Sequence, residues 1–220
     1  MPRTGRPRQF DRDAALDAAM QLFWRQGFES TSLDQLKRAM GGLSAASFYG
    51  AFGSKETLYR ETLDRYLGTH GQVVGALHDE TLAPRDALER ALRLSARMQT
   101  NAGLPKGCML VLSTLNASPE NHPLQALVAA ERQRSRDAIR RGIDRAVASG
   151  ELRPDADAEG LATLAEALLV GMSVQARDGV TQAAIEAAVS SLLHLWDTNR
   201  ARPRKPSTAP GTGGAGTPVH

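Results

Sequence analysis

Helix start and stop signals divide the first 60 residues of the chain into a series of short helices. The first helix has the i, i+3, i+4, i+7 spacing of a buried helix face, formed by Leu16, Ala19, Met20 and Phe23. Asp11 is a suitable N-cap for this helix and Gly27 a suitable stop. A second, shorter helix is predicted to start at Thr31 or Ser32. Short helices with such tight connections leave few ways of packing this part of the chain.

A glycine-containing turn over residues 40–43 follows the second helix. Ser44 can cap a third helix, which is predicted to end at Phe52-Gly53, and Ser54 can cap a fourth. The fourth helix is predicted to be long and to reach His78. Helix, short helix, turn and short helix form the arrangement of a helix-turn-helix, whose last helix enters the major groove of DNA.

The rest of the chain, up to Arg200, also has the composition of helices. Strand-like alternation is absent, and Ala, Leu, Arg and Glu dominate. Five more helices are predicted, over residues 85–101, 108–116, 124–149, 158–177 and 182–196. The prediction is an all-α fold of about nine helices. Its four parts are a flexible basic arm, a helix-turn-helix domain, a second helical domain and a disordered tail, over residues 1–8, 9–66, 67–199 and 200–220.

The third predicted helix is unusually rich in small residues. A helix that reads DNA needs small residues where its backbone approaches the duplex, and four positions meet this need: Ala45, Ala46, Gly50 and Ala51. Ser44, Ser47 and Tyr49 supply polar groups that can reach bases or phosphates. The positions expected to face inward are Leu43, Phe48 and Phe52. A packed helical hairpin without function is the alternative explanation of the same residues.

Residues Phe10 to Tyr66 resemble the DNA-binding domain of TetR/AcrR-family transcriptional repressors. The matching positions are Ala15, Leu16, Ala19, Leu22 and Phe23, then Gly27-Phe28, Thr31 to Leu36, Leu43-Ser44, Ser47 to Tyr49, and Phe52 to Leu58. Agreement at so many spaced positions is specific to this family. The match covers about a quarter of the chain, and the helical remainder has the family's usual length.

The resemblance implies a homodimeric regulator, most often a repressor, that binds a palindromic operator in double-stranded DNA. The residues that would line the major groove are Ser44, Ala45, Ser47, Tyr49 and Gly50. Thr31 or Ser32 would meet a phosphate at a helix N-terminus, and Lys55 would hold the DNA backbone at the start of the fourth helix. The basic arm would reach a minor groove, or it is a solubilising tail.

The sequence departs from the family pattern in two places. The turn between the second and third helices is one residue longer, and Gly41-Gly42 are expected to absorb the addition. The lysine often found near position 45 and the histidine near position 50 or 51 are replaced here by alanine and glycine. Contact with thymine methyl groups and the shape of the DNA are therefore expected to contribute more to sequence reading.

The resemblance also implies a small-molecule effector and a dimer interface in the second domain. The residues expected to line an effector pocket between the middle helices are Met98, Met109, Leu112, Leu115 and Gln175. Core packing explains these five residues equally well. The last two helices would pair with their copies in a second subunit through Leu161, Leu164, Leu168, Gly171, Met172, Ile185, Ala188, Leu192, Leu195 and Trp196. The alternative is that these residues face only the core of their own chain.

Two further expectations concern signalling in the second domain. An effector among the middle helices could push the fourth helix as a rigid lever, and Gly68 and Gly71 are the places where that helix could bend. Cys108, the only cysteine, is either a redox or electrophile sensor or a buried structural residue.

Charge and composition agree with a DNA-binding protein of the cytoplasm. Residues 1–60 hold nine Lys/Arg and six Asp/Glu, residues 61–199 hold fourteen and eighteen, and residues 200–220 hold four and none. Basic ends of this kind either contact the phosphates of nucleic acid or form a solvated surface, and charge alone does not decide between the two. A single cysteine suits a reducing compartment, no apolar run approaches the roughly 20 residues of a membrane span, and no secretory signal is visible. The prediction is a cytoplasmic protein without membrane contact.

The sequence contains no pattern that indicates catalysis or metal binding. The histidines are scattered without ligand spacing, at His70, His78, His122, His194 and His220. Phosphate-binding loops, nucleophile elbows and paired cysteines are absent. We therefore predict no enzymatic activity, no metal and no cofactor. A helical adaptor that binds protein in place of DNA is the main alternative, and an all-helical enzyme is a more distant one.

Overall fold

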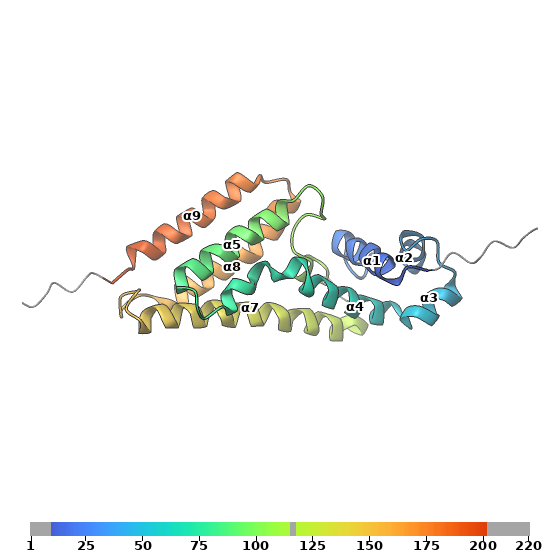
Figure 1. Cartoon of the computed structure of the whole chain (residues 1–220), viewed down its shortest axis with the longest axis horizontal. Helices are drawn as coiled ribbons and strands as arrows, with labels where there is room; N and C mark the ends of the chain where they lie inside the picture. The colour runs from blue at the N-terminus through green and yellow to red at the C-terminus, as the bar shows by residue number, and fades with distance from the viewer. Residues whose placement is uncertain (1–9, 115–117, 202–220) are drawn as a thin grey trace, which may run out of the picture.

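A computed structural model describes residues 10–114 and 118–201. These residues form an all-α fold, as predicted, with nine α-helices and two short 3-10 segments (Figure 1). The elements are α1 Arg12–Gln26, α2 Leu33–Ala39, α3 Ala45–Phe52, α4 Lys55–Gly68, η1 His70–His78, α5 Pro84–Thr100, α6 Met109–Leu112, η2 Pro119–Asn121, α7 His122–Ala148, α8 Ala158–Arg177 and α9 Gln182–Thr198. None of these helices is long and apolar enough to cross a membrane. The predicted arm of residues 1–8 and the tail beyond Ala201 lie outside the described residues.

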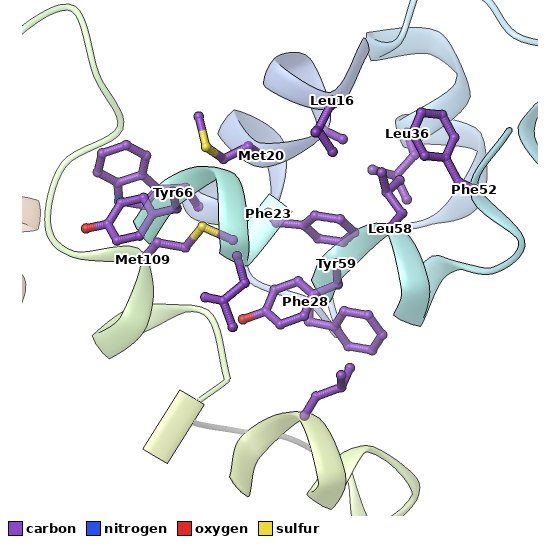
Figure 2. Packing of buried hydrophobic residues seen from close by; sticks show 14 of the residues in the cluster. Leu16, Met20, Phe23, Phe28, Leu36, Phe52, Leu58, Tyr59, Tyr66 and Met109 are labelled. Carbon is purple, nitrogen blue, oxygen red and sulfur yellow. The ribbon is translucent and has the colours of Figure 1, made fainter. Parts of the chain in front are cut away.

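The helices build an elongated molecule, with α1, α2 and α3 at one end and α9 at the other (Figure 1). The side chains of α1 to α4 bury one hydrophobic cluster, which we call the N-terminal cluster (Figure 2). Helices α5, α7, α8 and α9 bury a second, which we call the C-terminal cluster. The N-terminal cluster also takes in residues beyond the boundary predicted at residue 66, namely Met98, Met109, Leu110, Leu124 and Val128. The two parts of the chain therefore share packing.

The predicted caps at the starts of the first four helices are confirmed. The Asp11 carboxylate accepts a hydrogen bond from the Ala14 amide at 3.0 Å. Ser32 forms a reciprocal capping box with Gln35, because each side chain bonds the backbone amide of the other residue. The hydroxyls of Ser44 and Ser54 accept from amides three residues further on, both at 3.1 Å. Such caps satisfy amide groups that have no partner within a helix and so fix where each helix begins.

The turn between α2 and α3 is built by its two glycines. Gly41 and Gly42 have φ angles of +92° and +78°, a region that residues with a Cβ rarely adopt. The amides of Gly42 and Leu43 then both donate to the Lys37 carbonyl, at 2.9 and 3.0 Å. The two glycines therefore form a closed turn at the end of α2.

The prediction of one continuous helix from Ser54 to His78 is wrong. Helix α4 ends at Gly68, Thr69 has φ −126° and ψ −90°, and residues His70–His78 form a 3-10 segment. The Thr69 hydroxyl donates to the Arg65 carbonyl at 2.7 Å and so helps to close the end of α4. Glycine has a low helix propensity, and this stretch contains three glycines within eight residues. The rigid lever that the sequence suggested is therefore interrupted at its middle.

The helix predicted over residues 108–116 is also shorter than expected. Among the described residues it is helical only over Met109–Leu112. The Ser113 carbonyl leaves the helix and accepts a hydrogen bond from the Phe28 amide at 2.9 Å. Leu115, one of the predicted pocket residues, lies outside the described residues. A contact between distant parts of the chain thus competes with continuation of this helix.

Gly107 lies at the junction of the two parts of the molecule. Its carbonyl accepts a hydrogen bond from Trp24 Nε1 on α1 at 2.9 Å, and its amide donates to the Gln99 carbonyl at 3.0 Å. Its φ is +83°, and a Cβ added there would lie 2.7 Å from the Ser173 carbonyl oxygen. Only glycine lets α1, α5 and α8 approach one another so closely at this point.

Replacing Gly107 with alanine should lower the free energy of unfolding by about 3 kcal/mol. The left-handed conformation accounts for roughly 1–2 kcal/mol and the crowding against backbone for about 1–3 kcal/mol. Gly150→Ala is the matched control, because its φ is +77° and an added Cβ meets no atom within 4 Å. Urea unfolding of both variants measures the difference, and equal losses would show that Gly107 is not a packing constraint.

Candidate nucleic-acid interface and effector cavity

Helix α3 presents small and polar side chains to solvent. Phe48 and Phe52 are buried, whereas the intervening Tyr49 is 52% exposed. The other residues predicted to line a major groove are all exposed: Ser44, Ala45, Ser47 and Gly50. The structure therefore brings all five predicted groove residues onto one exposed surface, which we call the reading face.

The buried side of α3 is held by α1 and α4. The Phe52 ring meets the Phe10 ring edge to face, with centroids 6.1 Å apart. The Arg12 guanidinium lies 4.8 Å from the Phe52 ring centroid and pairs with Glu61 of α4 at 2.6 Å. These contacts fix the orientation of α3, so the reading face has a defined direction.

The two serines at the start of α3 are hydrogen-bonded to each other. The Ser44 hydroxyl donates to Ser47 Oγ at 2.9 Å while accepting from the Ser47 amide. The Ser47 hydroxyl keeps its own proton for an outside acceptor. Ser47 is thus arranged to donate to a base or a phosphate.

Gly50 has no internal reason to be glycine. It is exposed, it lies within α3, and a Cβ added to it would meet no protein atom within 4 Å. Glycine within a helix costs about 1 kcal/mol relative to alanine. The open space beside its backbone is therefore consistent with close approach by a partner outside the chain.

The two candidates for a phosphate contact before α2 differ in exposure. Thr31 is fully buried, and its hydroxyl donates to the Gly27 carbonyl at 2.5 Å. It also accepts from the Gln26 side chain at 3.2 Å, so its hydroxyl has no free direction towards DNA. The prediction that Thr31 contacts a phosphate is therefore wrong. This residue instead supports the connection between α1 and α2. Ser32 is exposed and remains a candidate at the N-terminus of α2.

Lys55, the first residue of α4, lies against the protein surface. Its ammonium is 4.2 Å from the centroid of the Phe28 ring. Burial lowers the pKa of this ammonium, and the carboxylates of Glu29 and Glu56 oppose that shift. The predicted contact with the DNA backbone stays a prediction, and the structure adds a cation–π contact that also holds α4 in place.

A small, partly open cavity with a volume of about 50 Å³ lies among η1, α5, α6, α7 and α8. Of the residues predicted to line an effector pocket, Met98 does so. Met109 is buried in the N-terminal cluster, and Leu112 is not among the lining residues. Gln175 is exposed on α8. The structure therefore does not bring the predicted pocket residues together.

The polar residues of this cavity were missed by the sequence analysis. They are Ser95, Gln99, Arg132, Ser135, Arg136 and Glu166. Ser95 and Gln99 lie one helical turn apart among the buried residues of α5. Polar residues at this spacing on an otherwise apolar helix face were the available signal, since buried polar groups need partners.

Cys108 lines the same cavity. Its sulfur accepts a hydrogen bond from the Tyr66 hydroxyl at 3.3 Å. Burial raises the pKa of the Cys108 thiol, and burial likewise raises the pKa of Tyr66. A thiol with a raised pKa has little thiolate at neutral pH, which favours the structural alternative for this cysteine.

Helix α6 connects the cavity with the helix-turn-helix. Leu110 and Val111 line the cavity, and the Leu110 carbonyl accepts from Arg132 at 2.6 Å. One turn later, Ser113 Oγ is hydrogen-bonded to the Tyr59 hydroxyl of α4 at 2.5 Å. The same residue binds the Phe28 amide through its carbonyl. A displacement of α6 would therefore reach both α4 and the α1–α2 connection.

Further hydrogen bonds join the two parts of the chain. Arg177, at the end of α8, donates to the Arg25 carbonyl at 2.7 Å and so caps the last turn of α1. The Glu29 carboxylate accepts from the Ser118 amide at 2.6 Å and from Asn121 Nδ2 at 2.9 Å. These bonds give α7 and α8 direct connections to the helix-turn-helix.

The predicted dimer residues of α8 and α9 separate into two groups. Five are buried in the chain's own core and cannot reach a second subunit: Leu161, Met172, Ile185, Leu192 and Trp196. Leu164 and Leu195 are 45% and 40% exposed. Leu168, Gly171 and Ala188 are partly exposed. The correction follows from helix geometry, because a helix buried against its own chain has only one remaining face for a partner.

Both parts of the chain match known family models. Residues 15–62 match the model for bacterial regulatory proteins of the tetR family, and residues 84–192 match that for a tetracyclin repressor-like C-terminal domain. The HTH-type transcriptional repressor ComR of Escherichia coli (strain K12) is 33% identical over 193 residues, which are 87% of this chain and 91% of that protein.

Solved structures show the same similarity. A cysteine mutant of the TetR family transcriptional regulator CifR, complexed with 26bp double-strand operator DNA, has a TM-score of 0.78 and 40% identity. The match covers 87% of this chain and 100% of the CifR chain. A TetR transcriptional regulator from Chloroflexus aurantiacus J-10-FL has a TM-score of 0.72 and 25% identity, covering 86% of this chain and 94% of its own. With family models that match both of its parts and a relative that is similar over nearly its whole length, the chain belongs to the TetR family of bacterial transcriptional regulators.

Proposed function

We propose that this protein is a transcriptional repressor that binds a palindromic DNA operator as a homodimer and releases it when a small molecule enters the cavity. The observation that carries the proposal is the reading face of α3, where small and polar residues are exposed and aromatic residues hold the helix from behind. The similarity to ComR, a repressor, and to CifR, solved with operator DNA, supports the same function.

The reading face suits a major groove because it is small, polar and fixed in direction. Tyr49 can stack on or bond to a base edge, and Ser47 can donate a hydrogen bond. The N-termini of α2 and α4 lie on either side of α3 in the chain and carry Ser32 and Lys55, which can meet phosphates. We place this activity in the cytoplasm, where bacterial operators are found.

Dimerisation would use the exposed face of α8 and α9. Leu164 and Val174 of α8 and Leu195 of α9 are large apolar side chains that are between 40% and 49% exposed. Gly171 lies between the first two on α8, and an added Cβ there would meet no atom within 4 Å. A second copy of the chain would cover these side chains, and the glycine would permit close helix crossing.

Effector binding would act on DNA binding through α6. Leu110 and Val111 line the cavity, so a molecule between α5 and α6 would displace them, and Ser113 would transmit that displacement to Tyr59 and Phe28 through its hydrogen bonds. For a tenfold loss of DNA affinity, the effector needs only about 1.4 kcal/mol of preference for the released state. This path replaces the continuous lever expected from the sequence.

The main alternative is a helical adaptor whose helix-turn-helix binds protein. A gel shift with the purified protein and DNA selected from a random pool separates the two functions. Retarded DNA supports the repressor, and failure to select any sequence would favour the adaptor.

Replacing Gly50 with alanine should stabilise the protein and weaken operator binding. The melting temperature should rise by about 2–4 °C, because alanine is favoured in a helix by about 1 kcal/mol and the methyl group meets no protein atom. Operator affinity should fall about tenfold, since the methyl group would enter the space that the DNA would occupy under this proposal. Calorimetry and gel shifts measure the two effects.

Gly142→Ala is the matched control for this experiment. Gly142 lies within α7, and an added Cβ there also meets no atom within 4 Å. This variant should gain stability and keep its operator affinity. If Gly50→Ala bound the operator as tightly as the control, the assignment of the reading face would be wrong.

Charged substitutions at the proposed dimer face should produce a monomer. The double variant Leu164→Glu, Leu195→Glu places two carboxylates where the helices of a second subunit would pack, so its mass by light scattering should fall to that of one 23.6 kDa chain. Leu94→Glu, at an α5 leucine that is 36% exposed, should leave the dimer intact. A double variant that remained dimeric would place the interface elsewhere.

A further inference from the structure

The effector cavity carries one unbalanced positive charge. The charged side chains that line it are Arg132, Arg136 and Glu166. Arg136 and Glu166 form an ion pair with each other. Arg132 makes no ion pair with any of the described residues and gives one hydrogen bond, from Nη1 to the Leu110 carbonyl. The rest of its guanidinium can bind a ligand, because arginine has five N–H donors.

The cavity also contains neutral polar groups that lack partners. Ser95 is fully buried, and its hydroxyl has no hydrogen-bond partner in the described part of the chain. Gln99 is also buried, and Ser173 binds its amide oxygen at 2.8 Å. Whichever way the amide is turned, its other end remains for a ligand. A buried hydroxyl without a partner in the protein needs one from outside, either a water molecule or a ligand.

The remaining walls are apolar or uncharged. They include Val73 and Val74 of η1, Met98 of α5, Val111 of α6, Ile139 of α7 and Leu169 of α8. Cys108 and Tyr66 line the cavity as neutral groups, since burial raises the pKa of each. A ligand therefore meets an apolar environment with a guanidinium on α7 and two neutral polar groups on α5.

We infer that the effector is a small carboxylate with an apolar body and one uncharged hydroxyl or carbonyl group. The inference rests on the proposed function of the cavity as the effector site. The carboxylate would accept two parallel hydrogen bonds from Arg132, the geometry that a guanidinium favours. The apolar body would lie among the valine, methionine and leucine side chains, and the neutral group would meet Ser95 and Gln99.

Other classes of ligand fit these groups less well. A wholly apolar molecule would strip water from Arg132 and leave Ser95 without a partner, which costs free energy. A cation would meet the positive charge of Arg132 without a free carboxylate to compensate it, because Glu166 is already paired. The charge balance thus selects an anion.

Binding of matched probes to the purified full-length protein tests the inference. Isothermal titration calorimetry at neutral pH would compare 3-phenylpropanoate with 3-phenylpropanamide, which share one shape and differ in charge. The carboxylate should bind at least about tenfold more tightly, as expected for a charge-assisted hydrogen bond. Equal binding of the two, or binding of neither at millimolar concentration, would overturn the inference.

Variants of α7 identify the group responsible for this preference. Arg132→Gln should bind both probes equally, whereas Arg132→Lys should keep part of the preference because it keeps the charge. Arg134→Gln is the matched control, since Arg134 is exposed on the same helix and pairs with Glu131. Melting temperatures confirm that each variant is folded. A preference that survives in Arg132→Gln would contradict the assignment.

A separate pair of probes tests whether Ser95 binds the uncharged polar group of the ligand. 3-(4-Hydroxyphenyl)propanoate should bind about fivefold more tightly than 3-phenylpropanoate, and Ser95→Ala should remove that gain without changing binding of the second probe. A gain that persists in Ser95→Ala would remove this residue from the site. Gel shifts with selected DNA distinguish a failure of the inferred ligand class from a failure of the proposed function. If the protein binds DNA normally but the probes do not behave as expected, only the inferred ligand class is wrong. If the protein does not bind DNA, the proposed function is wrong.

Discussion

The burial of aromatic rings among α1, α4 and the α1–α2 connection is the constraint on which the rest of the structure depends. The rings of Phe23, Phe28 and Tyr59 lie with their centroids between 5.1 and 5.8 Å apart (Figure 2). Burial of such rings dominates core energetics, and their mutual geometry adds further stabilisation. Because Phe48 and Phe52 are buried in the same cluster, the small and polar side of α3 must face outwards. The reading face is therefore a consequence of the core behind it.

The same cluster prevents the helix-turn-helix from being an independent unit. Tyr59 belongs to the core, yet its hydroxyl is hydrogen-bonded to Ser113, one turn beyond the cavity wall of α6. Burial raises the pKa of Tyr59 to about 12, so this hydroxyl stays protonated at any physiological pH. Trp24, Glu29 and Arg25 make further bonds to the second part of the chain. Under the proposed function, a ligand in the cavity would influence DNA binding through these contacts.

Local chemistry allowed the fold and the reading face to be predicted, but not the cavity. Caps such as Ser32 and Ser44 and apolar spacing are encoded within one helix, so they are visible in the sequence. The cavity depends on which faces of five elements meet, and no local pattern specifies that. Met109 and Ser95 show the difference, because the residue that was expected in the pocket fills the core and an unremarked serine lines the cavity. A contact with the distant Phe28 amide accompanies the early end of α6, whereas α4 ends at a glycine-rich stretch that the sequence does show.

Sequencing the DNA that the purified protein selects from a random pool tests the central claim most directly. In a homodimer, the two copies of the reading face are related by a two-fold axis. Both can bind DNA at the same time only where two half-sites are arranged as an inverted repeat. The expected result is an enriched inverted repeat whose half-site centres are separated by one turn of DNA, about 34 Å, or a multiple of it. Enrichment of a single unpaired site, or no enrichment at all, would contradict it.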